Sequence, residues 1–176
     1  IISVEYNSQV GANFVPNDDN YPNQWAHDNQ GQAVSYNGIN VGLENCDMDT
    51  DLAWDITMGS ENVIIAIIDS GVDLDHPEFE GKIVPGYDFV NNDEIAQDDY
   101  GHGTACAGVA AAIGNNSIGI AGVAWQSLIM PVKVLASDGY GDENDISDGI
   151  IWATENNANV ISMSLGGGGY SSATNS

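Results

Sequence analysis

The chain has 176 residues, which is about one domain's worth of sequence. Hydrophobic residues make up 43% and charged residues 16%, a composition that excludes a disordered tail or a coiled coil. The 26 Asp and Glu residues against 2 Lys and Arg give a net charge of −24, which argues against binding to nucleic acids or to an anionic membrane surface.

The N-terminal part of the chain divides into two stretches. Residues 1–8 alternate between apolar and polar side chains, as a β-strand does. Residues 17–48 are rich in Asn, Asp, Gln and Gly, so we expect a surface arm of turns that contributes little to a hydrophobic core. Residues 50–58 then predict a short helix that is closed by Gly59.

Three continuous apolar runs follow, at residues 62–69, 127–135 and 159–163. Such runs are typical of strands buried on both faces, which belong to parallel sheets covered by helices. Two helices are predicted between them. Residues 102–113 are small and apolar all round, and residues 144–157 begin with the capping residues Asn144 and Asp145. This order predicts an α/β fold with a doubly wound, mostly parallel sheet and helices on both faces.

Two residues in this pattern point to chemistry. Asp69 ends the first apolar run, where the functional groups of such sheets gather, and a buried carboxylate must be hydrogen-bonded or paired. Its position alone suits a helix cap, a phosphoacceptor, a metal ligand or the orienting member of a catalytic triad. A phosphoacceptor is disfavoured because Gly71 stands where a second acidic residue is wanted. His102 lies between two glycines at the start of a helix, where an exposed catalytic group would be held rigidly.

The motifs resemble those of the subtilisin-like serine proteases, the subtilases of peptidase family S8. They occur in unbroken order within residues 50–169, at positions 63–72, 76–77, 101–108, 115–124, 132–135 and 160–167. The resemblance implies a subtilisin-like fold and a serine endopeptidase that hydrolyses peptide bonds by acyl transfer. It makes Asp69 the triad aspartate and His102 the general base. It also places Cys106 beneath the histidine, where a thiol is most simply a buried hydrophobic group.

The same resemblance implies two edges that bind the substrate backbone as an added strand. One edge is formed by Ser164, Leu165 and Gly166, and the opposite one by Gly139, Tyr140 and Gly141. Leu135 would line a small apolar subsite beside His102. The acidic residues that follow the second edge are read as a solvated cluster that caps a helix, with a preference for basic substrate residues as the alternative.

Residues 113–120 resemble the calcium loop of the family, with Gly114 as an extra residue. The implied ligands are all oxygens, as calcium prefers. They are the Glu78 carboxylate, the Asn116 side chain and the carbonyls of Ile113, Ile118 and Ile120. Asp18 or Asp19 in the arm is a candidate to complete this structural calcium site. The alternative is that the loop is simply a turn.

The serine nucleophile and the oxyanion asparagine of the family have no counterpart in this sequence. We therefore expect residues 49–176 to be the N-terminal half of a catalytic domain, incomplete at its C-terminus, and residues 1–16 to be the end of a prosegment with its junction. The expected partners are peptide or protein substrates, the protein's own inhibitory prosegment and the remainder of the domain. We expect a secreted protein whose isolated chain is inactive. The alternative is an inert calcium-dependent binding or inhibitory module on a truncated subtilase fold.

Overall fold

The computed structural model describes residues 14–33 and 42–167. Within them, four parallel strands form one sheet in the order β2-β3-β1-β4. Their bounds are Ile64–Asp69 for β1, Tyr87–Asp88 for β2, Leu128–Lys133 for β3 and Val160–Ser162 for β4. The predicted α/β class with a parallel sheet is thus confirmed. None of the helices in this part of the chain has the length and apolar character needed to cross a membrane.

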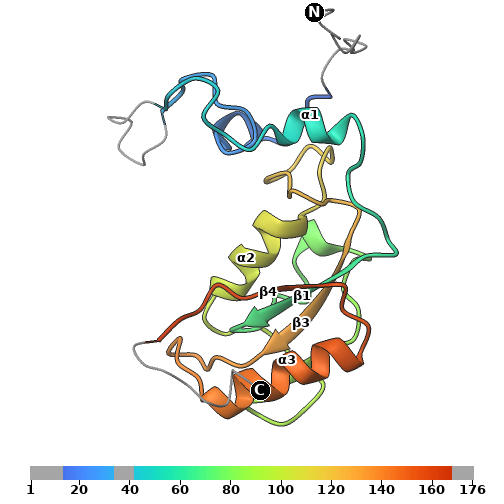
Figure 1. The fold of residues 1–176 in the computed structure, drawn as a ribbon. Coiled ribbons are helices and arrows are strands. Elements are labelled where there is room, and N and C mark those ends of the chain that lie inside the picture. Colours follow the sequence, from blue (N-terminus) through green and yellow to red (C-terminus); the bar gives the residue numbers. More distant parts are fainter. Residues whose placement is uncertain (1–13, 34–41, 168–176) are drawn as a thin grey trace, which may run out of the picture.

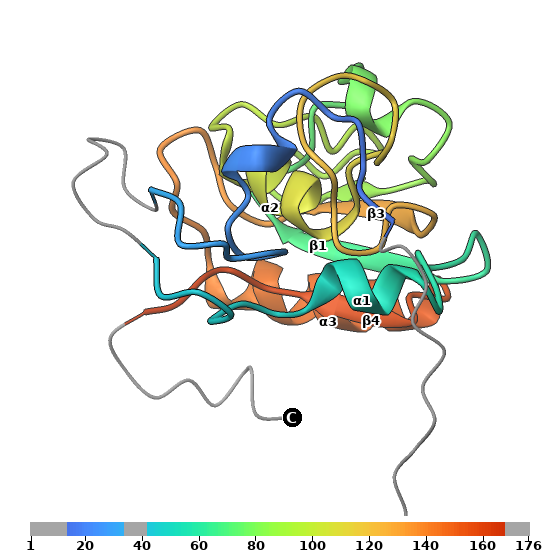
Figure 2. The same ribbon diagram turned by 90° about the horizontal axis from the view of Figure 1, so that it is seen from above.

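Helices cover both faces of the sheet, as predicted. Helix α2 (His102–Ala111) lies against one face and α3 (Glu143–Glu155) against the other (Figures 1 and 2). The shorter elements are α1 (Thr50–Trp54) and two 3-10 helices, η1 (Tyr21–Asn23) and η2 (Pro77–Phe79). Strand β2 and both 3-10 helices were not predicted, because two- and three-residue elements leave no periodic pattern in a sequence.

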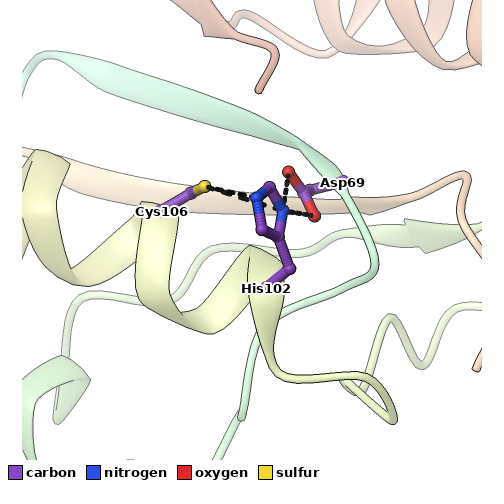
Figure 3. A group of neighbouring side chains, drawn as sticks. All are labelled: Asp69, His102 and Cys106. Carbon is purple, nitrogen blue, oxygen red and sulfur yellow. Dashed lines mark hydrogen bonds and ion pairs between the residues drawn. The ribbon is translucent and has the colours of Figure 1, made fainter. Parts of the chain in front are cut away.

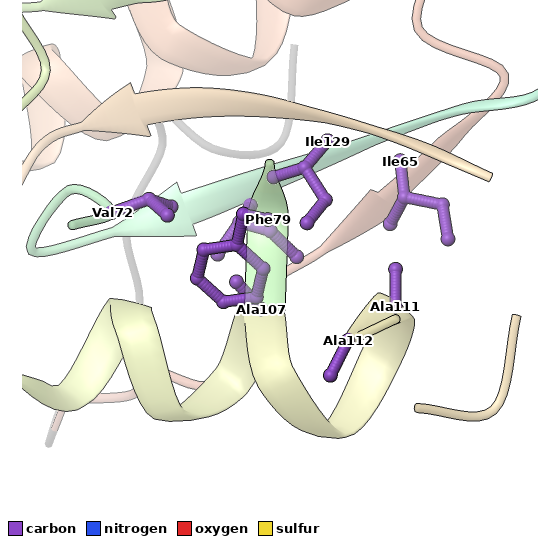
Figure 4. Close-up of a cluster of buried hydrophobic side chains, with 8 residues drawn as sticks. Ile65, Val72, Phe79, Ala107, Ala111, Ala112 and Ile129 are labelled. Atoms are coloured by element: carbon purple, nitrogen blue, oxygen red, sulfur yellow. The ribbon is translucent and has the colours of Figure 1, made fainter. Parts of the chain in front are cut away.

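The alternation of side chains along β1 divides the core into two layers. Ile65 and Ile67 pack in one cluster with alanines of α2. Figure 4 shows Ile65 on the side of the sheet that faces this helix. Ala66 and Ile68 belong to the other layer, with Ala153 of α3. Because both faces are buried, every position of the strand is apolar until its last residue, which explains the continuous run in the sequence.

We expected the N-terminal arm to contribute little to the hydrophobic core, and this expectation was wrong. Tyr21 is buried together with Trp54, Ala121 and Trp125 in a third hydrophobic cluster. His27 lies beside them, with its ring centroid 5.0 Å from that of Trp54. A few aromatic side chains within a polar segment are enough to fix the arm to the domain, although they give no periodic signal.

Several helix boundaries also differ from the prediction: α2 ends at Ala111 rather than residue 113, and α3 ends at Glu155 rather than residue 157. Helix α1 ends at Trp54 rather than near residue 58. The indole Nε1 of Trp54 donates a hydrogen bond to the carbonyl of Val123 at 2.9 Å. Helix α3 begins at Glu143, with Asp142 at the N-cap. The strand-like residues 1–8 lie outside the described residues, so the assignment of residues 1–16 to a prosegment stays a prediction.

His27 should make stability depend on pH. Its Nδ1 lies 2.6 Å from Thr50 Oγ1, and burial lowers its pKa below the ordinary value. A lowered histidine pKa favours the neutral ring in the folded state, so this stabilisation is complete above about pH 6.5 and is lost as the pH falls through the folded pKa. Thermal unfolding between pH 8 and pH 5 should show a steeper loss of melting temperature for the wild type than for His27→Gln. Parallel curves would contradict the prediction.

Candidate active site

Asp69 is held at the carboxyl edge of the sheet by its neighbours in the structure. It is the last residue of β1 and is fully buried. Its Oδ1 accepts a hydrogen bond from the N–H of Ser70 at 2.8 Å, and its carbonyl accepts from the N–H of Leu135 at 3.1 Å. The Asp69 side chain therefore has a fixed direction, toward the start of α2.

His102, the first residue of α2, meets Asp69 directly. Its Nδ1 lies 2.8 Å from Oδ1 and 3.0 Å from Oδ2 of the carboxylate (Figure 3). Its side chain is 44% exposed while that of Asp69 is 1% exposed. A buried carboxylate that accepts from Nδ1–H leaves Nε2 of an exposed ring available as a proton acceptor.

Cys106 lies one helical turn after His102, on the other side of the ring from Asp69 (Figure 3). Its Sγ is 3.8 Å from Nδ1 and 4.0 Å from Nε2, so the thiol is nearly equidistant from both nitrogens. Burial raises the pKa of this thiol. Catalytic thiols have a lowered pKa and a short hydrogen bond to the base, whereas the contacts of this thiol with the ring are long. Cys106 therefore lacks the features of a nucleophile, and the sequence interpretation of a packed thiol fits.

Asp69, His102 and Cys106 also form the single group of three metal-ligating side chains that converge among the described residues. Their ligand atoms all lie within 4.8 Å of one another. The carboxylate already engages Nδ1, which is the arrangement of a proton-transfer pair rather than of a metal centre.

Asp98, which the sequence analysis did not single out, is the main acceptor at the start of α2. It accepts from the N–H groups of Tyr100, Gly101 and Thr104 and from the Thr104 hydroxyl. Although burial acts to raise the pKa of Asp98, the hydrogen bonds from Thr104, Gly101 and Tyr100 lower it to about 2. The residue is therefore ionised at neutral pH, next to the helix that carries His102.

The residues predicted to form one substrate edge lie close to this pair. Ser164 follows β4, whose Ser162 pairs with Ile67, two residues before Asp69. Leu165 packs on the same apolar layer as Leu135, whose N–H is bonded to Asp69. Gly166 has open space around the position of a Cβ. The structure thus brings one predicted edge and the predicted subsite to the carboxyl end of β1.

The opposite edge is a tight turn. The Ala136 N–H donates to the carbonyl of Tyr140 at 2.7 Å, and the Tyr140 side chain is exposed. Gly139 has a φ of +82°, and a Cβ there would lie 2.7 Å from the Tyr100 ring. A Cβ on Gly141 would lie 2.1 Å from the carbonyl oxygen of Val134. These contacts explain both glycines by close packing, and their role in substrate binding stays a prediction.

The predicted calcium loop is fixed by two buried carboxylates. Asp18 is 3% and Glu78 is 4% exposed, and neither is in an ion pair with a cation of the described chain. Asp18 accepts from the N–H of Asn115 at 2.7 Å. Glu78 accepts from the Asn116 side-chain amide and from the N–H of Ile120, both at 3.0 Å. Two buried carboxylates on a polar loop, neither in an ion pair, fit the ligand chemistry of calcium.

Two of the predicted ligands also form hydrogen bonds that hold the loop. Asn116 Oδ1 accepts from the N–H of Ile118, and the N–H of Ile113 donates to the backbone carbonyl of Glu78. Of the two candidate carboxylates in the arm, Asp18 is the one that bonds to the loop, whereas Asp19 is exposed. The carbonyls of Ile113, Ile118 and Ile120 stay predicted ligands.

Comparison with known proteins gives one consistent family. A sequence model described as the Subtilase family matches residues 60–176. A thermophilic serine proteinase of Bacillus sp. (strain AK1) is 48% identical over 131 residues, covering 74% of this chain and 32% of the relative. An extracellular protease of Xanthomonas campestris pv. campestris is 32% identical over 210 residues, covering 98% of this chain and 33% of the relative.

A solved structure has the same fold. A protease from Pseudoalteromonas arctica PAMC 21717 superposes with a TM-score of 0.75 at 34% identity, over 90% of this chain and 53% of that one. The chain thus spans about a third of the two relatives and about half of this structure.

Proposed function

The chain belongs to the subtilase family, and we propose that it supplies the aspartate and histidine of a subtilisin-like serine endopeptidase. The observation that carries this proposal is the contact between Asp69 and His102. A buried carboxylate 2.8 Å from Nδ1 of an exposed imidazole is the arrangement that activates a serine hydroxyl in acyl transfer. The resemblance to serine proteinases supports the same chemistry.

The roles of the two residues follow from their geometry. Asp69 accepts from Nδ1–H and so keeps the proton off Nε2 of His102. Nε2 then takes the proton of the serine hydroxyl as the hydroxyl attacks the peptide carbonyl, and later gives it to the leaving amine. The carboxylate stabilises the imidazolium that forms between these steps. In this proposal the serine and the oxyanion donors come from the remainder of the catalytic domain.

Peptide or protein substrates would bind between the two edges described above, with Leu135 below them. The remainder of the domain would continue the sheet beside β4, where Val160 is 49% and Met163 is 46% exposed. An outer strand that leaves apolar side chains exposed favours pairing with a further strand. We also propose a secreted protein that its own prosegment inhibits, in keeping with the relative named as an extracellular protease.

An activity assay tests the proposed function. We define the assembled protease as this chain joined to the serine-bearing remainder of a subtilase catalytic domain. It should hydrolyse a chromogenic peptide and lose that activity when its serine is replaced by Ala, while the isolated chain should show no turnover. Turnover by the isolated chain would refute the proposal that the triad serine comes from the remainder of the domain. An assembled protein that folds but does not cleave would favour the inert calcium-dependent module.

We further propose that calcium binds at residues 113–120, held by Glu78, Asn116 and Asp18 together with the carbonyls predicted from the sequence. The bound ion would neutralise the two buried carboxylates and attach the arm to the loop. Its role is structural, since the loop residues and the catalytic pair share no hydrogen bond in the described structure.

Calcium should therefore raise the stability of the protein. A calcium concentration of 100 times the Kd should add about 2.7 kcal/mol to the free energy of unfolding, and a chelator should remove it. Calorimetric melting of Asp18→Asn and Glu78→Gln should show little response to calcium. Asp19→Asn removes the neighbouring exposed carboxylate and should keep the full response. Equal responses in all three variants would contradict the site.

A further inference from the structure

The first turn of α2 has no capping side chain of its own. Its N-cap residue is Gly101, whose φ is +98°. The N–H groups at the start of a helix have no acceptor within the helix and need one from elsewhere. Asp98 accepts from Gly101 N–H at 2.8 Å and from Thr104 N–H at 2.9 Å, and Ser70 Oγ accepts from Gly103 N–H at 2.9 Å. Groups outside the helix therefore accept from the N–H groups of Gly103 and Thr104 in its first turn.

These two caps are joined to each other and to the catalytic carboxylate. The hydroxyl of Ser70 donates to Asp98 Oδ1 at 2.8 Å, and the N–H of Ser70 donates to Asp69 Oδ1 at 2.8 Å. Lys133, which is buried, donates from Nζ to the carbonyl of Ser70 at 2.9 Å. Every polar group of Ser70 is thus engaged, and the residue links the end of β1 to the start of α2.

The position of the helix start matters because little else holds the His102 ring. Nearly half of its side chain is exposed, so packing alone does not fix its direction. Its place against Asp69 depends on where the backbone of residue 102 lies relative to the end of β1. Charge-assisted hydrogen bonds from a carboxylate to several N–H groups are strong and directional, which suits them to set that distance.

We propose that Asp98 is a positioning residue that acts through Ser70 and the first turn of α2 to align His102 Nδ1 with the Asp69 carboxylate. Asp98 forms no hydrogen bond with the His102 ring in the described structure, so its effect on the ring passes through other groups. The proposal rests on the proposed function and deepens it, by adding a residue on which proton transfer depends.

The substitution Asp98→Asn tests the proposal in the isolated chain, without any need for activity. Oδ1 of Asp98 accepts from Ser70 and Gly101, and Oδ2 accepts from Thr104. The amide of asparagine has a single acceptor oxygen, so one of these two groups of donors loses its partner. In 15N-histidine NMR spectra, we expect the Nδ1–H signal of His102 to exchange with water at least tenfold faster than in the wild type.

Asp99→Asn is the matched control. It removes the same charge one residue along the chain, where Asp99 pairs with Lys133 rather than with α2. The amide oxygen can still accept from that lysine, so the exchange rate should stay at the wild-type value. Backbone amide signals of β1 and β3 check that each variant is folded. An unchanged Nδ1–H exchange rate in folded Asp98→Asn would overturn the proposal.

A second pair of variants decides the question if Asp98→Asn does not fold. Thr104→Val keeps the shape of the side chain but removes the hydroxyl, which donates to Asp98 and accepts from the N–H of Asp73 at 2.9 Å, whereas Thr104→Ser keeps both bonds. The valine variant should show the faster exchange and the serine variant the wild-type rate. Equal rates in the two would overturn the proposal.

Kinetics of the assembled protease gives an independent readout. Asp98→Asn should lower kcat by about 10- to 100-fold with KM within twofold of the wild type, because small misplacements of a catalytic group slow the chemical step. A rise in KM at constant kcat would contradict a positioning role. If the unsubstituted assembly is itself inactive, the proposed function fails, while the NMR comparison still decides the role of Asp98.

Discussion

The substitution Asp69→Asn should lower kcat of the assembled protease about 10⁴-fold, the loss known for the orienting aspartate of serine protease triads. Asp69 is the acceptor for Nδ1–H of His102, at 2.8 and 3.0 Å from its two oxygens. An amide at this position can donate to Nδ1 and so favours the tautomer with the proton on Nε2, which can no longer accept the serine proton. Initial rates on a chromogenic peptide measure the effect.

The control for this substitution is Asp75→Asn, which removes an exposed carboxylate from the segment that follows β1. It should retain activity within about twofold, because surface substitutions of this kind have small effects. If both variants lose activity equally, the loss comes from charge alone, and the proposed role of Asp69 is wrong. KM should change little in either variant, since neither carboxylate lies on the predicted substrate edges.

The substitution Gly103→Ala should disrupt the site without altering any catalytic group. A Cβ at this position would lie 2.1 Å from the carbonyl oxygen of Gly71 and 3.1 Å from Cβ of Asp69, so α2 would have to move away from β1. We expect a loss of about 1–3 kcal/mol in the free energy of unfolding from this overpacking. Displacing His102 by about 1 Å should also lower kcat about 100-fold.

Gly108→Ala is a control in the same helix. Its Cβ would meet only Ile120 Cδ1 at 3.5 Å, an ordinary contact. Alanine is the better helix former by about 1 kcal/mol, so this variant should be as stable as the wild type or more stable, with unchanged kcat. Denaturant unfolding and peptide hydrolysis should therefore separate the two variants. If Gly103→Ala behaves like Gly108→Ala, the close approach of α2 to β1 does not position the histidine.

The sequence predicts the layers of this fold well because β1 is buried on both faces. Ile65 and Ile67 serve one layer while Ala66 and Ile68 serve the other, which leaves a continuous apolar run that ends at Asp69. The pairing of Asp69 with His102 could be predicted from the motifs that contain them. Such motifs combine an unusual residue with the glycines that its local backbone requires.

The parts that escaped prediction depend on contacts between distant segments. Asp98 and Ser70 are 28 residues apart, and nothing in either local pattern shows that they share a hydrogen bond. The burial of Tyr21 depends likewise on Trp54 and Trp125, which lie far along the chain. Polar partners and aromatic anchors of this kind are determined by tertiary structure, whereas periodic patterns are determined by single elements.

The parallel pairing of β1 also has a consequence for folding kinetics. Its contacts close long loops: the hydrogen bond between Lys133 and Ser70 spans 63 residues, and that between Ile64 and Asn159 spans 95. The entropy of closing such loops is lost before the contacts they allow are formed, and folding rates fall as contact order rises. Refolding from denaturant should therefore be slow, and the isoleucines of β1 stay open to aggregation until the later strands have joined it.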